Sequence, residues 1–239
     1  MCSSDLVAAL GLGAIIWMQA ALLVFAAVAA FRLPEPGARK AAAIRGPGFG
    51  VLRIPAFRGI VLVAALVLGS HAMHDAFAVI RWRDAGIGAP AISLLWSEAV
   101  AAEVVVFFLA GPWLLAKLTP AGAIGLAAVA GVARWGVMAQ TAAPAVIALV
   151  QPLHGLTFAL LHLSCMRLIA RVVPPGGEGT AQAIYATLGP GLASAVLTIA
   201  SGRLYGWAGP HAFWAMAALC ACALPVAFYL KTSPGRGAQ

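Results

Sequence analysis

The sequence predicts an all-α membrane protein with seven transmembrane helices. Of its 239 residues, 63% are hydrophobic and only 9% are charged, whereas a soluble domain carries about 25% charged residues. Such a chain cannot cover itself with a polar surface, so lipid must be the solvent for most of it. The apolar stretches are too long for membrane-spanning β-strands, which would also alternate apolar and polar residues.

Seven stretches approach or exceed the roughly 20 apolar residues that a helix needs to cross a bilayer. They are Leu6–Phe31, Phe57–Ile80, Ala89–Ala116, Ala121–Ala139, Pro144–Ile169, Ala181–Leu204 and His211–Leu230. The connection between the first two is long, rich in Gly and Pro, and holds six basic residues against one acidic residue. We therefore divide the chain into a single helix (1–31), a basic linker (32–58), six closely connected helices (59–230) and a short tail (231–239).

The basic residues outside the spans are distributed unevenly between the two sides. Eleven Lys and Arg fall on the linker side and three on the other side, so the positive-inside rule predicts a cytoplasmic linker and a cytoplasmic C-terminus. This distribution also argues against a nucleic-acid partner, because the net charge of +8 lies between apolar runs and forms no basic face. We expect the linker to be poorly ordered.

One helix, a basic loop and six helices match spans six to twelve of a transporter built from two six-helix halves. We therefore expect that an N-terminal half is missing from this chain. The alternative is a genuine seven-span protein.

Two neighbouring spans carry candidate site residues. Insertion of an ionisable side chain near the bilayer centre costs about 2.5–3.5 kcal/mol, so we expect each such residue to have a structural or functional role. In the second span, His71 and Asp75 are four residues apart and share a helix face; they form either a local pair near the membrane surface or a substrate or proton site. In the third span, Trp96 and Glu103 lie on one face, and Glu103 is near mid-membrane.

Arg134 in the fourth span carries a charge that cannot be neutralised at any relevant pH. We predict that it points into the bundle and lies close to a carboxylate. Glu103 is the first choice, because the two residues lie equally far from the short turn that joins their spans; Asp75 and Glu98 are the other options.

The fifth and sixth spans add further polar positions. Gln151, His154, Phe158 and His162 form one stripe of the fifth span, and either histidine could exchange protons. Tyr185 shares a face with Gly189 in the sixth span, where Gly189-Pro190-Gly191 predicts either a flexible or a static bend.

The sequence shows no sign of an enzyme. It lacks the HExxH and GxSxG motifs, and its cysteines lack the spacing of metal ligands. We therefore expect no cofactor and no metal.

Several segments carry a family resemblance. They are Ser70-His71-Ala72, Leu95-Trp96-Ser97, Ala102-Glu103-Val104, Val132-Ala133-Arg134-Trp135-Gly136, Leu153-His154, Thr157-Phe158, His162, Met166-Arg167, Gln182-Ala183-Ile184-Tyr185, Leu204-Tyr205 and Phe213-Trp214. In this order they resemble the second half of the 3-phenylpropionic acid transporter family, a branch of the major facilitator superfamily. The sequence departs from that family at His74-Asp75, where the family has aromatic residues.

The resemblance implies that the last six helices form a C-terminal major facilitator half-bundle. It also implies proton-coupled symport of a small organic solute, with an aromatic carboxylate as one option. In related transporters, acids on the seventh and eighth spans, an Arg on the ninth and a His on the tenth handle substrate and proton. Asp75, Glu103, Arg134 and His154 occupy the matching helices here.

We therefore expect a secondary transporter of the bacterial inner membrane that works by alternating access. Its partners would be the solute, protons, the lipid bilayer and the missing half. Two alternatives stay open: an intramembrane enzyme that uses Glu103, His154 and His162, and a membrane scaffold that does not transport.

Overall fold

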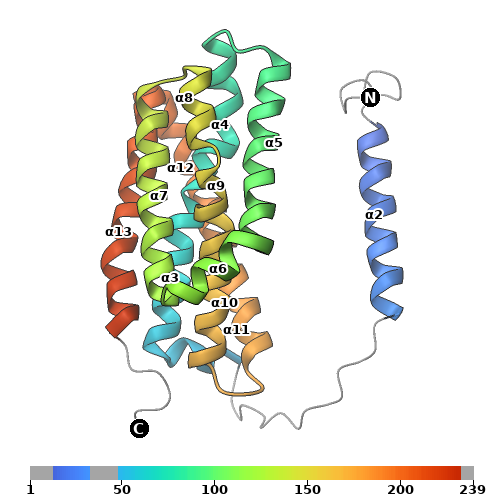
Figure 1. Cartoon of the computed structure of the whole chain (residues 1–239), viewed down its shortest axis with the longest axis vertical. Helices are drawn as coiled ribbons and strands as arrows, with labels where there is room; N and C mark the ends of the chain where they lie inside the picture. Colours follow the sequence, from blue (N-terminus) through green and yellow to red (C-terminus); the bar gives the residue numbers. More distant parts are fainter. Residues whose placement is uncertain (1–12, 33–47, 233–239) are drawn as a thin grey trace. The chain divides into compact units, whose positions relative to one another are not determined.

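A computed structural model describes residues 13–32 and 48–232, and every regular element within these ranges is a helix (Figure 1). The predicted all-α membrane class is confirmed. Five helical runs are long and apolar enough to cross a membrane: Pro55–Asp84, Ala89–Lys117, Pro120–Gln140, Pro144–Val172 and Glu178–Thr232. Helix α2 (Gly13–Arg32) is apolar as well and belongs to a separate unit from α3–α13.

The basic linker is only partly described, because residues 33–47 lie outside the described ranges. Its end is helical: the 3-10 helix η1 spans Gly48–Arg53 and α3 begins at Pro55. The prediction of a poorly ordered linker is therefore wrong for residues 48–58. Two features favour helix here, since Val51 is buried and Pro55 occupies a first-turn position, where a missing N–H breaks no helical bond.

Four of the five runs contain a break or an irregular turn. In chain order the remaining elements are α3 (Pro55–Gly69), α4 (His71–Asp84), α5 (Ala89–Val105), the π-helix η2 (Val106–Ala110), α6 (Gly111–Lys117), α7 (Pro120–Gln140), α8 (Pro144–Val150), α9 (Leu153–Gly155), the π-helix η3 (Leu156–Leu160), α10 (Leu161–Val172), α11 (Glu178–Ala186), the π-helix η4 (Thr187–Leu192), α12 (Ala193–Ala208), the 3-10 helix η5 (Gly209–Ala212) and α13 (Phe213–Thr232). Because η4 contains Pro190, the bend predicted at Gly189–Gly191 coincides with an irregular turn.

The last run reverses direction at Gly209. This glycine has φ +53°, a conformation that residues with a Cβ rarely adopt. Helices α12 and α13, on either side of it, both pack against α3 and α4. The run thus consists of two antiparallel helices, in agreement with the two stretches expected there, although the total of seven crossings stays a prediction.

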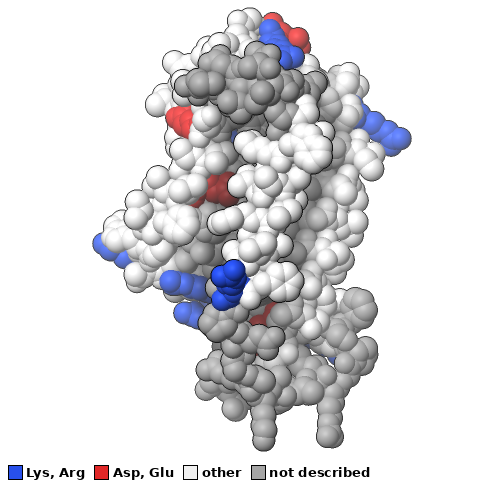
Figure 2. All heavy atoms as spheres, turned by 90° about the vertical axis from the view of Figure 1, so that its right-hand side faces the viewer, with Lys and Arg blue, Asp and Glu red and all other residues white. Residues whose placement is uncertain are grey.

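Helix α7 lies at the centre of the packing, with α13, α10 and the π-helix η3 against it. The core contains large side chains such as Phe57, Trp135 and Phe213, none of them exposed. Large apolar side chains also lie on the surface, among them Phe108, Trp207 and Phe228. Uncharged residues supply most of the described atoms visible in Figure 2, as expected for a surface that faces lipid.

Candidate functional site

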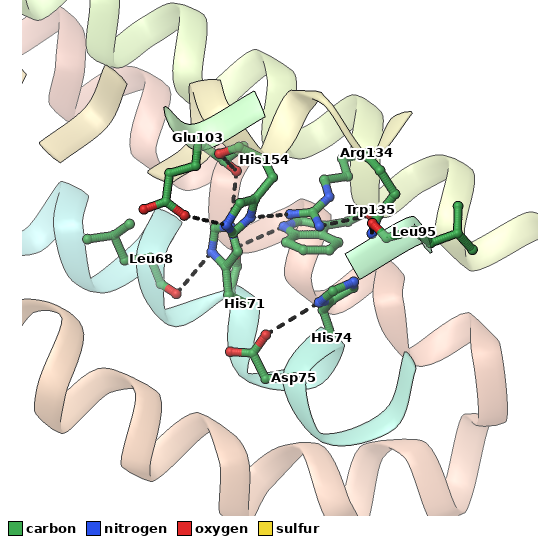
Figure 3. A network of polar contacts seen from close by, with 12 residues as sticks. Leu68, His71, His74, Asp75, Leu95, Glu103, Arg134, Trp135 and His154 are labelled. Atoms are coloured by element: carbon green, nitrogen blue, oxygen red, sulfur yellow. Dashed lines mark hydrogen bonds and ion pairs between the residues drawn. The ribbon is translucent and has the colours of Figure 1, made fainter. Parts of the chain in front are cut away.

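Arg134 lies at the centre of a polar network inside the bundle (Figure 3). Its side chain is fully buried, which confirms that it points away from lipid. The guanidinium donates from NH1 to Nδ1 of His154 at 3.1 Å and from NH2 to Oε1 of Gln151 at 3.0 Å. It also lies over the ring of Trp135, with Cζ 4.5 Å from the ring centroid, a favourable arrangement for a cation.

The predicted direct pair between Arg134 and a carboxylate is wrong. Among the described residues, no carboxylate oxygen lies within 4.0 Å of the guanidinium. His154 lies between the two charges instead, with its Nε2 3.3 Å from Oε2 of Glu103. In Figure 3, Glu103 and Arg134 approach the imidazole of His154 from different sides.

Gly155 explains why Glu103 contacts His154 and not Arg134. A Cβ atom placed on Gly155 would lie 2.6 Å from the carbonyl oxygen of Ala102, so α9 and α5 touch backbone to backbone at this point. Because His154 immediately precedes the contact, its ring lies beside the Glu103 side chain. The sequence argument for Glu103 and Arg134 used their distance from the turn, but the intervening helix decides which side chains meet.

Gln151 holds the other side of the guanidinium. It lies in the turn between α8 and α9, next to Pro152, whose missing N–H interrupts the helix. The side-chain amide donates from Nε2 to the carbonyl oxygen of Leu95 at 3.1 Å, which orients Oε1 towards Arg134. Gln151 is fully buried, so the Pro144–Val172 run contributes two neutral acceptors, Gln151 and His154, to one buried cation.

His71 lies next to His154, with a distance of 5.2 Å between the ring centroids. Its Nδ1 is 3.1 Å from the carbonyl oxygens of both Val67 and Leu68, and its Nε2 is 3.0 Å from Oγ1 of Thr157. The local pair that we considered between His71 and Asp75 is not formed. Asp75 contacts Nδ1 of His74 at 3.3 Å instead, and 61% of its side chain is exposed.

The bend between α3 and α4 positions His71. At this bend, Ser70 Oγ donates to the carbonyl oxygen of Val67 at 2.6 Å and accepts from Nε1 of Trp135 at 2.8 Å. A serine that bonds back to the preceding turn bends a helix. Through Ser70, the bend is therefore hydrogen-bonded to Trp135, the residue next to Arg134.

Tryptophan rings surround His74. Trp96, Trp82 and Trp135 have ring centroids 4.7, 5.7 and 5.7 Å from that of His74. Trp96 and Glu103 lie seven residues apart on the uninterrupted helix α5 and so share a face, as expected; Trp96 packs on His74, and Glu103 contacts His154.

The predicted stripe on the fifth span divides into two groups. Phe158 stacks on His154 with ring centroids 5.5 Å apart, whereas His162 lies beside Phe107 and Tyr185 at 6.1 and 5.9 Å. The π-helix η3, which includes Phe158, lies between His154 and His162, and its i→i+5 bonds make this turn one residue wider than an α-helical turn. No contact joins the His162 group to Arg134 among the described residues.

Thr157 and Trp82 were not among the predicted site residues. Thr157 is fully buried and forms a hydrogen bond with His71. In the sequence, its position three residues after His154 was the feature that could have indicated this role. Trp82 offered no such signal. Over the described ranges, no group of three or more His, Cys, Asp and Glu could hold a metal ion.

Comparisons with known proteins identify the family of the chain. The model of the MFS_1 like family matches residues 4–216. A protein of Escherichia coli (strain K12), described as a probable 3-phenylpropionic acid transporter, is 38% identical over 164 residues, which are 68% of this chain and 42% of that relative. The chain thus spans about two-fifths of the length of this curated relative, and the resemblance seen in the sequence is confirmed. The chain belongs to the MFS_1 like family of major facilitator transporters.

Proposed function

We propose that this chain provides one side of the substrate path in a transporter that moves a small organic carboxylate together with protons. The observation that carries the proposal is the unbalanced charge of Arg134. Its two hydrogen-bond partners, His154 and Gln151, can both be neutral, and its Nε atom is buried without a partner.

A carboxylate ligand would supply the missing negative charge. A guanidinium has a planar set of donors that matches two carboxylate oxygens, and a buried cation without an anion costs several kcal/mol. The relative's described substrate, 3-phenylpropionic acid, contains such a carboxylate and an aromatic ring. The exposed edge of Phe158, 37% accessible, offers an apolar surface for the ring beside His154.

In this proposal, residues 59–230 act as the C-terminal half of the transporter. Asp75 and Glu103 remain partly accessible, with 61% and 24% of their side chains exposed, which is compatible with an approach of substrate or protons to them. An N-terminal half would complete the site and rock against this one, so that the site opens to each side in turn. The transporter would lie in a bacterial inner membrane with its linker and C-terminus in the cytoplasm.

Uptake of radiolabelled 3-phenylpropionate into liposomes that contain the natural protein tests the proposal. We expect accumulation when the outside is acidified, loss of accumulation with a protonophore, and competition by other arylalkyl carboxylates. The Arg134→Gln variant should lose carboxylate binding. Arg203→Gln is the matched control, because Arg203 is exposed.

Competition that does not depend on a carboxylate group would contradict the proposed role of Arg134. If uncharged aromatic solutes compete as well as carboxylates do, Arg134 does not bind the substrate. Membership of a transporter family favours transport over the intramembrane-enzyme and scaffold alternatives.

A further inference from the structure

We propose that His71 binds the coupling proton, with Thr157 as the group that adapts to its two protonation states. This inference rests on the proposed proton-coupled function and deepens it by naming the proton site. It follows from the donors and acceptors around each buried histidine.

His71 can hold a second proton without any movement of heavy atoms. Its Nδ1 faces only the carbonyl oxygens of Val67 and Leu68, at 3.1 Å each, so Nδ1 must carry a hydrogen at all times. Its Nε2 faces Oγ1 of Thr157 at 3.0 Å, and the same Oγ1 lies 3.2 Å from the carbonyl oxygen of His154. A threonine hydroxyl has one hydrogen and can both donate and accept.

Two arrangements of that hydrogen satisfy the same geometry. When the Thr157 hydroxyl donates to Nε2, His71 is neutral. When the hydroxyl turns to donate to the carbonyl oxygen of His154, Nε2 must carry a hydrogen, and His71 is an imidazolium. A proton that enters on Nε2 therefore needs only a rotation of one O–H bond.

The other two histidines of the network lack this property. The Nδ1 atom of His154 accepts from Arg134, which has donors only, so a proton on this nitrogen would break the bond between them. The Nε2 atom of His74 is buried without a partner, so a hydrogen there would stay unsatisfied. His71 is the member of the network with a partner for both nitrogens in both states.

The surrounding charges link this proton to the substrate. The titratable and charged groups near His71 are Arg134 on α7, His154 on α9, and His74 and Asp75 on its own helix. Glu103 on α5 reaches the far nitrogen of His154, and α13 contributes the thiol of Cys220 through Ser70.

The permanent charge of Arg134 opposes a second positive charge on His71. A substrate carboxylate on Arg134 removes that opposition, so substrate and proton favour each other's binding. Thermodynamic linkage requires the two effects to be equal, and such couplings are about 5- to 150-fold.

Proton uptake upon ligand binding tests the assignment. The natural protein is solubilised in weakly buffered detergent with a pH-sensitive dye and titrated with 3-phenylpropionate at several pH values. We expect a net uptake that stays below one proton per carboxylate bound and passes through a maximum as the pH is varied, as linkage requires for one coupled site. His71→Gln should abolish this uptake and weaken carboxylate binding about 5- to 150-fold at acidic pH.

Thr157→Val should reduce the proton uptake, because it removes the acceptor for the second hydrogen, and Thr157→Ser should retain it. Thr198→Val is the matched control, since the exposed Thr198 hydroxyl bonds only within α12. If His71→Gln does not fold, judged by thermal unfolding, the pair of Thr157 variants decides.

Two other outcomes would contradict the inference about His71, and they differ in whether the proposed function is kept. Undiminished proton uptake in His71→Gln or in Thr157→Val removes His71 as the proton site and leaves the proposed function intact. If the natural protein binds no carboxylate, the proposed function fails together with this inference.

Discussion

The close contact at Gly155 predicts that one added methyl group at this position destabilises the protein. In Gly155→Ala, the new Cβ would lie 2.6 Å from the carbonyl oxygen of Ala102 and 2.8 Å from Cγ2 of Val106. The Val106 side chain can rotate, but the carbonyl belongs to the backbone of α5. Relief of the contact therefore requires that α5 and α9 move apart.

The size of this movement follows from the distances. Ordinary contact begins at 3.4 Å, so the helices must separate by about 0.8 Å (3.4 − 2.6). If the whole movement is added to the 3.3 Å between His154 Nε2 and Glu103 Oε2, that distance becomes about 4.1 Å, beyond hydrogen-bond range. Overpacking of this kind costs about 1–3 kcal/mol.

Thermal unfolding in detergent and carboxylate uptake by the natural protein measure the two consequences. We expect Gly155→Ala to unfold at a lower temperature and to transport poorly. Gly202→Ala is the control, because a Cβ on Gly202 meets nothing within 4 Å and alanine favours helix by about 0.5–1 kcal/mol. A Val106→Ala change added to Gly155→Ala should restore only part of the loss, since the backbone contact persists. Equal unfolding temperatures and activities for the Gly155 and Gly202 variants would refute the reasoning.

Three further predictions follow from the network and the topology. Gln151→Leu leaves an Arg134 donor without its partner, which should lower the free energy of unfolding by about 1–3 kcal/mol; unchanged denaturant stability would contradict this. The exchange of charges in Glu103→Arg with Arg134→Glu should not restore the uptake that either single change removes, because His154 separates the two positions; recovery of uptake would indicate a direct pair. A cysteine at Ala42 should react with a membrane-impermeant thiol reagent only from the cytoplasmic side, and labelling from the opposite side alone would invert the topology.

The sequence predicted which side chains enter the bundle better than which of them touch. That Arg134, His154 and Gln151 turn away from lipid follows from the cost of placing polar groups there, whereas their mutual contacts were not predicted. The order of contacts depends on how closely two backbones approach, and Gly155 determines that approach. Nothing in the spacing of Glu103 and Arg134 along the chain reveals that a third helix comes between them.

The errors on the fifth span have a different cause. The stripe that joined His154 to His162 assumed an unbroken α-helix with 3.6 residues per turn. Pro152 and the π-helix that follows it interrupt this periodicity, so residues after the irregular turn face another direction. A proline can be read directly from a sequence. Whether the helix forms a kink, a π turn or a break near that proline depends on the neighbouring helices.

The π turn at Leu156–Leu160 has a consequence for how such transporters diversify. In register it is equivalent to a single inserted residue, so the loss of one residue there could return the segment to an ordinary α-helix. Because the wider turn accommodates the extra residue, His162 and the helix beyond it would still face Phe107 and Tyr185 after that loss. One codon can thus be gained or lost at this point without rotating the rest of the segment, so His154 and His162 keep their separate neighbours although their spacing along the chain changes.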